Sequence, residues 1–201
     1  GAAFLASRTR CLLQDEMGCG KTLQALAALP EGAALLVVCP AAVKAVWRRE
    51  IERFRPELDV EVLRGRGSFR YPQAGEVVIL NFELLPDIVP EGCPEGCTLL
   101  ADEAHAFKNF KAKRTLAFRA LGAAIRAKGG RTWLLTGTPL TNRPPDLWGV
   151  LQAAGLAHDV FGSWPYFAEL MGGYQHIVDR RGTKVWFWGQ PQGEAVAGRL
   201  A

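Results

Sequence analysis

The sequence lacks any apolar run approaching the roughly 20 residues that a helix needs to cross a bilayer. Its first ten residues, GAAFLASRTR, contain neither the long hydrophobic stretch nor the cleavage pattern of a secretion signal. Internal repeats and low-complexity segments are also missing. These absences argue against a helical membrane protein, a secreted precursor and a repeat protein, and we expect no membrane partner.

The five cysteines do not show the pattern of a disulfide framework or a metal cage. The count is odd, and most of the five lie within apolar segments: Cys11, Cys19, Cys39, Cys93 and Cys97. A reduced, intracellular protein is the simplest interpretation. Cys93 and Cys97 flank Pro-Glu-Gly, but no second ligand pair with metal-like spacing accompanies them, so zinc is not favoured.

Charge is also modest. The 201 residues include 24 Lys and Arg against 20 Asp and Glu, a formal net charge of +4, and 49% of the chain is apolar. This length and composition suit a globular chain with one sizeable core and a small appendage. The basic excess is compatible with a phosphate-rich partner but does not establish one.

Short apolar runs alternate with longer amphipathic stretches through most of the chain. The short runs predict strands at residues 11–13, 34–39, 60–63, 77–80, 98–101 and 132–135. Helical spacing predicts helices at residues 21–29, 41–54, 113–127 and 145–154. Fully apolar strands that alternate with helices are typical of an α/β fold whose parallel sheet is covered on both faces. Ligands in such folds bind at the carboxyl ends of the strands.

The pattern changes after about residue 156. A helix is expected at residues 164–171, followed by β-prone runs at 174–178 and 184–188 around a polar turn that ends in glycine. These runs predict a hairpin. We therefore predict a ligand-binding lobe over residues 1–156 and a small helix and hairpin extension over residues 157–201.

The segment DEMGCGKT lies between a predicted strand and a predicted helix. Its glycines allow successive N–H groups to face inward as an anion nest at a helix N-terminus. Lys21 is expected to reach the β- and γ-phosphates of ATP, and the Thr22 hydroxyl to bind Mg²⁺. Asp15 stands where the usual phosphate loop has glycine, so a plain Gly-rich turn with a solvated lysine is the alternative. The predicted ATP contacts are Asp15, Met17, Gly18, Cys19, Gly20, Lys21 and Thr22.

An acidic pair follows the apolar run at residues 98–101. Two adjacent carboxylates are costly beside an apolar strand unless a cation or water holds them. Asp102 therefore suits a role in holding Mg²⁺, partly through water, and Glu103 suits orienting and deprotonating an attacking water. Acidic residues at a helix N-terminus are the alternative, which the presence of Lys21 and Thr22 makes less favoured.

A third polar segment, LLTGTPLTN, follows the run at residues 132–135. Hydroxyl groups and a glycine at a strand end can respond to the water around a γ-phosphate. A simple turn with Pro and Asn would look similar. The predicted coupling residues are His105, Thr136, Gly137 and Thr138.

Taken in order, these segments resemble the N-terminal RecA-like lobe of SNF2 ATPases in helicase superfamily two. DEMGCGKT is similar to motif I of that family, including the acid at Asp15, although Cys19 stands where leucine is usual and Gln14 where alanine is usual. VVCPAAVKAVWRREIERF resembles motif Ia, in which Pro40, Lys44 and Trp47 match characteristic positions.

The resemblance continues along the chain. VVILNFELL resembles the strand and polar segment that come next in the family, DEAH with Lys108 and Asn109 resembles motif II, and LLTGTPLTNRPPDLW resembles motif III. FGSWPYFAELMGGY, the hairpin and residues 189–200 look like the stretch before the second lobe in the annealing-helicase and phage-like branch.

The resemblance implies a P-loop NTPase fold and ATP hydrolysis coupled to tracking along double-stranded DNA, generally without unwinding it. The second RecA-like lobe of the family supplies an arginine to the catalytic site, and no motif of that lobe occurs in the sequence. An adenine-recognising glutamine segment is also missing. We therefore expect this chain alone to hydrolyse ATP weakly or not at all.

The resemblance also carries DNA-binding roles to Lys44, Lys108, Thr138 and Asn142. From the residues alone, Lys44 and nearby arginines are more typical of solvated surface, and Trp47 fits an apolar packing stripe better than base stacking. No recognition-helix motif is present, so DNA contacts should be to the backbone and independent of sequence.

Two other functions stay open at this point. One is a strand-separating RNA or DNA helicase of the same superfamily, although RNA-type relatives carry a shorter Ser-Ala-Thr in place of TGTPLTN. The other is a non-catalytic nucleotide-binding module, which is disfavoured because Lys21, Thr22, Asp102 and Glu103 are all present. The Ala-, Gly- and Arg-rich composition suggests a GC-rich bacterial or phage genome. We expect a cytoplasmic, nucleoid-associated protein.

Overall fold

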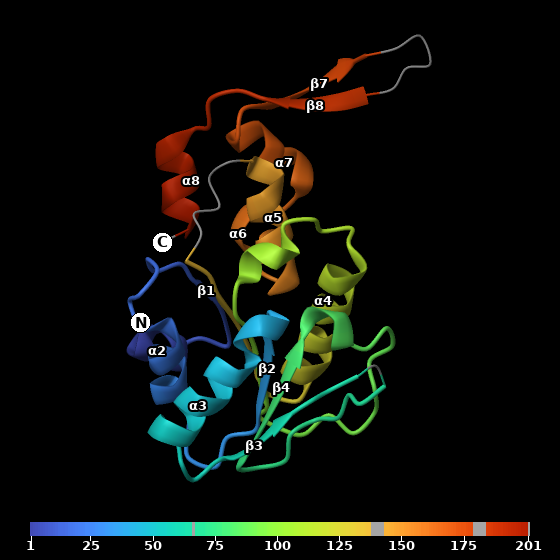
Figure 1. The fold of residues 1–201 in the computed structure, drawn as a ribbon. Helices are drawn as coiled ribbons and strands as arrows, with labels where there is room; N and C mark the ends of the chain where they lie inside the picture. The colour runs from blue at the N-terminus through green and yellow to red at the C-terminus, as the bar shows by residue number, and fades with distance from the viewer. Residues whose placement is uncertain (66, 138–142, 179–183, 201) are drawn as a thin grey trace.

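The computed structural model describes residues 1–65, 67–137, 143–178 and 184–200. Its centre is a six-stranded sheet with the order β1-β6-β5-β2-β4-β3, and every neighbouring pair is parallel (Figure 1). The strands are β1 (Arg10–Leu13), β2 (Leu35–Cys39), β3 (Asp59–Val62), β4 (Glu76–Asn81), β5 (Thr98–Ala101) and β6 (Arg131–Leu135). The predicted α/β fold with a parallel sheet is confirmed.

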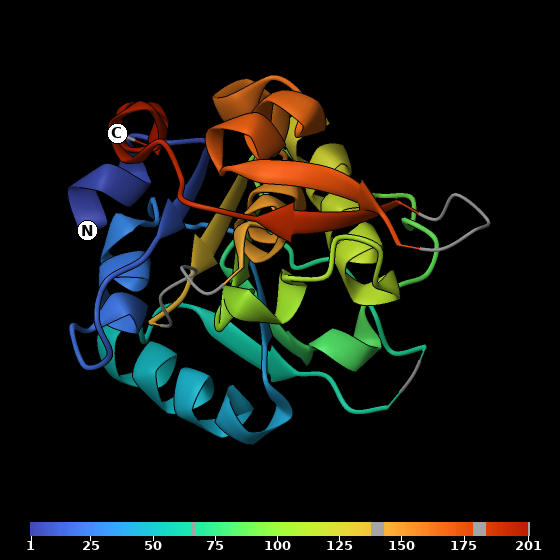
Figure 2. The same cartoon turned by 90° about the horizontal axis from the view of Figure 1, so that it is seen from above.

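Helices cover both faces of this sheet, as the view from above shows (Figure 2). One face packs against α1 (Ala2–Ala6), α2 (Lys21–Ala28) and α3 (Lys44–Phe54). Side chains of a strand point alternately to opposite faces, so in β2 Val37 belongs to this core and Val38 to the other. Because all five β2 residues are buried, the strand reads as a continuous apolar run.

The opposite face packs against the helices α4 (Lys113–Ala127), α5 (Pro144–Ala153), α6 (Ala157–Phe161) and α7 (Trp164–Leu170). Aromatic rings join the last three of these helices. The Trp148 ring centroid lies 5.4 Å from that of Trp164 and 5.1 Å from that of Phe167. The core of the lobe thus continues past residue 156, and the division of the chain at residues 156 and 157 stays a prediction.

The predicted hairpin is confirmed as β7 (Gly173–Ile177) and β8 (Lys184–Trp188), an antiparallel pair beyond α7 (Figure 1). The Trp188 ring lies 5.9 Å from the ring of Trp164 and so anchors the hairpin to α7. The described chain ends with α8 (Gly193–Leu200).

The structure also differs from the expected elements. The helix expected at 41–54 divides into the 3-10 turn η1 (Ala41–Val43) and α3. The short α1 and α6 and the terminal α8 were not expected, nor were the 3-10 turns η2 (Phe82–Leu84) and η3 (Ala104–Phe107). Elements of one or two turns show too few residues for their periodicity to be recognised.

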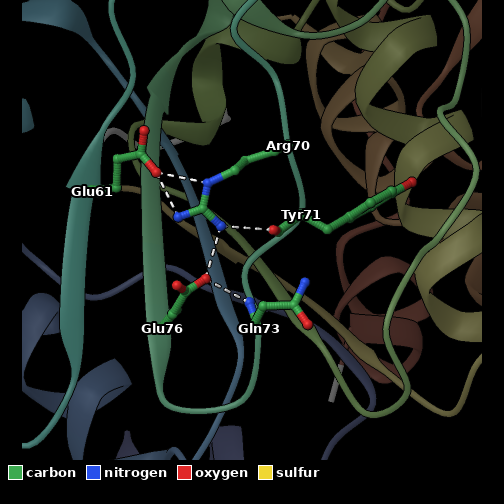
Figure 3. A network of polar contacts seen from close by, with 5 residues as sticks. All are labelled: Glu61, Arg70, Tyr71, Gln73 and Glu76. Carbon is green, nitrogen blue, oxygen red and sulfur yellow. Dashed lines mark hydrogen bonds and ion pairs between the residues drawn. The ribbon is translucent and has the colours of Figure 1, made fainter.

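A polar network secures the segment before β4 to the outer edge of the sheet (Figure 3). Arg70 Nε donates to Glu61 Oε2 at 2.7 Å, and its Nη1 donates to Glu76 Oε2 at 2.8 Å and to the Tyr71 carbonyl at 3.1 Å. The Arg70 guanidinium, followed by the Gln73 N–H, lowers the pKa of Glu76. The guanidinium thereby joins β3, β4 and the segment that connects them.

Within the part of the chain that the structure describes, no helix is long and apolar enough to cross a membrane.

Candidate nucleotide-binding site

Three neighbouring strands deliver the predicted site residues to one edge of the sheet. Leu13 of β1 is in register with Leu135 of β6, and Leu134 of β6 with Ala101 of β5. The Thr136 N–H extends this pairing by donating to the Leu13 carbonyl at 3.1 Å. The chain segments that follow β1, β5 and β6 therefore leave from the same corner, where ligands bind in parallel α/β sheets.

The loop after β1 has the backbone conformation of an anion site. Gly18 and Gly20 have φ angles of 86° and 69°, in the left-handed region that side chains with a Cβ rarely adopt. Gly20 is also the N-cap of α2, whose first N–H groups have no acceptor within the helix. The loop thus presents free donors and the positive end of a helix dipole to the same space.

The Lys21 side chain folds back over this loop. Its ammonium donates to the carbonyl of Asp15 at 2.9 Å and to the carbonyl of Glu16 at 2.8 Å. A Cβ added to Gly137 would lie 3.2 Å from Lys21 Nζ and 2.8 Å from Met17 Cγ. The loop after β6 thus lies against the side chains of the predicted phosphate loop, residues 15–22.

The acidic pair lies at the end of β5. Asp102 Oδ2 accepts a hydrogen bond from Trp47 Nε1 at 2.9 Å, and Asp102 Oδ1 accepts one from the Glu103 N–H at 3.0 Å. Glu103 has φ 55° and begins η3, and its Oε2 lies 3.1 Å from His105 Nδ1. Asp102 is therefore held at both oxygens, and Glu103 is half-buried beside a histidine.

The coupling and DNA-contact residues are only partly brought together. Thr136 is fully buried at the end of β6, and Gly137 lies against the phosphate loop. Lys108 is exposed at the end of η3. The predictions for Thr138 and Asn142 lie outside the described residues.

Lys44 lies farther along the same edge of the sheet. Its ammonium donates to the Leu63 carbonyl and to Asn81 Oδ1, each at 2.9 Å, so it joins the ends of β3 and β4. Asn81 Nδ2 in turn donates to the carboxylate of Glu83. This hydrogen bond is the largest cause of the lowered pKa of Glu83, to which Arg114 and Lys44 add smaller effects.

Two of these contacts were not predicted from the sequence, the hydrogen bond from Trp47 to Asp102 and the one from Lys44 to Asn81. The sequence pattern assigned Trp47 to packing and gave Asn81 no role. A tryptophan at helical spacing signals burial, but its hydrogen-bond partner, Asp102, is 55 residues away and is known only from the fold. The end of a buried strand was the one signal that could have indicated Asn81.

A cavity of about 580 Å³ lies away from the phosphate loop. It is formed by the loop before β4, by η2 and by the start of α4. Its charged lining residues are Glu83, Asp87, Lys113 and Arg114.

Among the described residues, no group of three or more His, Cys, Asp or Glu side chains is arranged to hold a metal ion. Magnesium in nucleotide sites takes one or two protein ligands and completes its shell with phosphate and water. Thr22 in the first turn of α2 and Asp102 at the end of β5 fit that donor set.

The comparisons with known proteins agree on one family. The SNF2-related domain matches residues 4–180. The DNA annealing helicase and endonuclease ZRANB3 of Homo sapiens is 32% identical over 84% of the chain. The SWI/SNF-related matrix-associated actin-dependent regulator of chromatin subfamily A-like protein 1 of Xenopus laevis is 34% identical over 76% of the chain. The chain spans 16% of the length of each of these relatives.

A solved structure shares both fold and sequence. The SWI2/SNF2 ATPase core of Sulfolobus solfataricus, determined in complex with double-stranded DNA, superposes with a TM-score of 0.67 at 26% identity. The match covers 85% of this chain and 37% of that one. The chain therefore belongs to the SNF2 family of helicase superfamily two and forms the N-terminal RecA-like lobe of the SNF2 ATPase core.

Proposed function

We propose that this chain is the ATP-binding lobe of a motor that moves along double-stranded DNA, and that it hydrolyses ATP only together with a second RecA-like lobe. The observation that carries the proposal is the meeting of three strand ends at one corner. There the phosphate loop, the acidic pair and Gly137 follow the neighbouring strands β1, β5 and β6.

The residues at this corner fit a magnesium nucleotide. The Lys21 ammonium donates to two loop carbonyls, and these are weaker partners than the oxygens of a phosphate. The turn at Gly18 and Gly20 aims N–H donors at the same space. When bound, Mg²⁺ neutralises charge on the β- and γ-phosphates of ATP.

Within the acidic pair, the two carboxylates have different surroundings. Asp102 receives two hydrogen bonds that fix its orientation, as a carboxylate that holds a metal requires. Glu103 is about one third exposed, so it is accessible to water. We assign Asp102 to magnesium and Glu103 to the orientation and deprotonation of the attacking water.

The second lobe is required because charge develops on the transferred phosphoryl group. Lys21 and the loop N–H groups neutralise part of it, and an arginine in such sites contributes a further factor of roughly 10³–10⁵ in turnover. We propose that this arginine comes from the second lobe.

Double-stranded DNA is the proposed track. Support comes from the structural neighbour determined with double-stranded DNA and from the relative named a DNA annealing helicase. Lys108 is exposed at the edge of the sheet where the nucleotide corner also lies, so its ammonium is available to a backbone phosphate. Contacts of this kind carry no sequence information, which suits a motor that moves along any duplex.

Substitution of Lys21 tests the nucleotide site. In the full-length protein, Lys21→Ala is expected to lower ATP affinity at least about 100-fold, because charge-assisted bonds to phosphate are lost. The control is Lys128→Ala, an exposed lysine just after α4 whose carbonyl binds the N–H of Gly96 at the opposite edge of the sheet. Unchanged affinity in Lys21→Ala, measured by titration with a fluorescent ATP analogue, would refute the phosphate-site assignment.

A second measurement tests the track. Steady-state ATP turnover of the full-length protein is expected to rise with duplex DNA of any sequence and to fall with salt as counterions compete. Stimulation by RNA in place of duplex DNA would instead favour an RNA helicase of the same superfamily.

A further inference from the structure

Helix α3 carries two polar contacts that lead to different strand ends. Trp47 is 1% exposed and packs in the core between α2, α3 and the sheet. Its indole N–H donates a hydrogen bond to Asp102 Oδ2, just beyond the end of β5, at 2.9 Å. Lys44 stands three residues earlier, on the same side of the helix. Its ammonium reaches the Leu63 carbonyl and Asn81 Oδ1, each at 2.9 Å.

Helix α3 therefore contacts strand ends on both sides of β2 at the carboxyl edge of the sheet. Asp102 follows β5, whereas Leu63 and Asn81 stand at the ends of β3 and β4. Strand β2 separates β5 from β4, so without α3 these ends would be joined only through the sheet itself.

The end of β2 lies between the two contacts. Cys39 is fully buried there, and its pKa is raised to about 12, mainly by desolvation and further by the Asp102 carboxylate, while Lys44 acts in the opposite direction. Both charges thus act on the same buried thiol. This places the two contacts close together in a region of low polarity, where electrostatic effects carry farther than in water.

We propose that Trp47 is a positioning residue for the acidic pair, and that through it α3 transmits events at the ends of β3 and β4 to the carboxylate of Asp102. This inference rests on the proposed function. The indole N–H holds Asp102 Oδ2 while the Glu103 N–H holds Oδ1, so the carboxylate keeps one orientation. A shift of α3 that begins at Lys44 moves the indole and turns the carboxylate with it.

Removing the indole N–H, with a matched control for the lost ring volume, separates this role from packing. Trp47→Phe keeps an aromatic ring in the core but leaves Asp102 Oδ2 without its donor. Loss of a partner that orients a metal ligand typically lowers metal affinity or activity about 10- to 100-fold. A tryptophan that only fills space would give a loss of stability and no specific effect on magnesium.

The chain offers a matched control. Trp133 is 0% exposed, belongs to the same core as Trp47 and also donates through Nε1, but to the Arg8 carbonyl at 3.0 Å. Trp133→Phe therefore makes the same exchange of an indole for a phenyl ring and removes an equivalent hydrogen bond without touching the acidic pair. Both variants are expected to lower the melting temperature by similar amounts.

The test uses the full-length protein and a fluorescent ATP analogue, titrated at saturating Mg²⁺ and again with the metal chelated. Trp47→Phe is expected to lose about 10-fold in affinity with Mg²⁺ and to keep the metal-free affinity of the parent. Trp133→Phe is expected to match the parent in both conditions. Equal behaviour of the two variants would overturn the inference.

A second arm addresses transmission along α3. In the parent, saturating duplex DNA is expected to change the affinity for the magnesium nucleotide, and in Trp47→Phe this change is expected to be largely lost. Retention of the full change in Trp47→Phe would contradict transmission through the indole. If the parent itself binds no nucleotide in a magnesium-dependent way, the proposed function fails rather than this inference.

A measurement on the unsubstituted residue covers the case in which Trp47→Phe does not fold. Residues 1–201 contain six tryptophans, and the indole N–H signal of Trp47 in an NMR spectrum is assigned by replacing the other tryptophans in turn. Addition of Mg²⁺ and the nucleotide is expected to shift the Trp47 signal and to leave the Trp133 signal in place. A Trp47 signal that does not respond would overturn the inference.

Discussion

Glu103 combines a predicted catalytic role with a strained backbone. Among the described residues it is the one non-glycine residue with a positive φ, 55°. The left-handed conformation costs a residue with a Cβ about 1–2 kcal/mol. The cost persists because fully buried residues hold the chain on both sides, Ala101 at the end of β5 and Ala104 at the start of η3. The turn lets Glu103 leave the sheet directly after Asp102.

We expect two substitutions at this residue to separate chemistry from strain. In the full-length protein, Glu103→Gln keeps the strained backbone and the hydrogen-bonding shape but cannot accept a proton. It should therefore bind ATP like the parent and lose about 10²- to 10⁴-fold in turnover. Glu103→Gly should lose turnover too, and should also relieve about 1 kcal/mol of strain.

Turnover assays and thermal unfolding of the three proteins check this prediction. Turnover within a few-fold of the parent in Glu103→Gln would contradict the role of general base. A melting temperature for Glu103→Gly below that of the parent would show that the Glu103 side chain stabilises the site more than its backbone strains it.

At the scale of residues, a candidate site residue was predictable only where a local sequence pattern indicated it. The residues of DEMGCGKT and the pair Asp102 and Glu103 were recognisable because strand ends in a parallel sheet bind ligands. The left-handed backbone of Glu103 and the bond from Trp47 to Asp102 were not. The first arises from packing on both sides of the residue, and the second joins positions that only the fold brings together.

At the scale of elements, Gly149 of α5 sets the distance between that helix and the end of η3. A Cβ at this position would come within 2.3 Å of the Lys108 carbonyl oxygen and 2.8 Å of the Phe107 carbonyl oxygen. These atoms belong to η3 and the residue after it, just beyond Asp102 and Glu103. At Gly149, helix α5 thus lies closer to the backbone of residues 107–108 than a residue with a Cβ would allow.

A pair of glycine substitutions tests this contact. Gly149→Ala is expected to lower the free energy of unfolding by about 1–3 kcal/mol, because backbone atoms must move apart. Gly198→Ala in α8, where a Cβ would meet nothing within 4 Å, is expected to raise it by about 0.5–1 kcal/mol through helix propensity. Denaturant unfolding of both variants gives the comparison, and a gain in stability in Gly149→Ala would contradict the close approach.

The elements themselves were predictable to the extent that burial is regular. Strands β2, β4, β5 and β6 are buried along most of their length, so their sequences read as apolar runs, and the parallel sheet followed from their alternation with helices. The division of residues 41–54 into η1 and α3 was not predictable from periodicity. The 3-10 turn begins directly after Pro40, which has no N–H to donate to a preceding residue.

At the scale of the whole molecule, the hydrophobic cores lie on the two faces of the sheet, while the nucleotide corner lies at its edge. Each face of the sheet has its own buried core, and the aromatic residues of α5 to α7 extend one of them to Met171. The phosphate loop, by contrast, is largely exposed, and Met17 within it is 80% exposed. The residues that stabilise the fold are therefore buried, whereas those of the phosphate loop and the acidic pair are exposed or half-buried at the edge of the sheet.

That difference predicts how residues 1–201 behave when produced alone. Because the two buried cores share one central sheet, we expect this chain to unfold in one cooperative transition and to bind ATP weakly through Lys21 and the loop N–H groups. Turnover should nevertheless be lower than that of the full-length protein by roughly 10³-fold or more, because the charge that develops on the phosphoryl group lacks the arginine that we propose the second lobe supplies. Calorimetry, nucleotide titration and steady-state hydrolysis of the two proteins at equal concentration test each part. Hydrolysis by residues 1–201 at the full-length rate would show that the catalytic site is complete within this lobe.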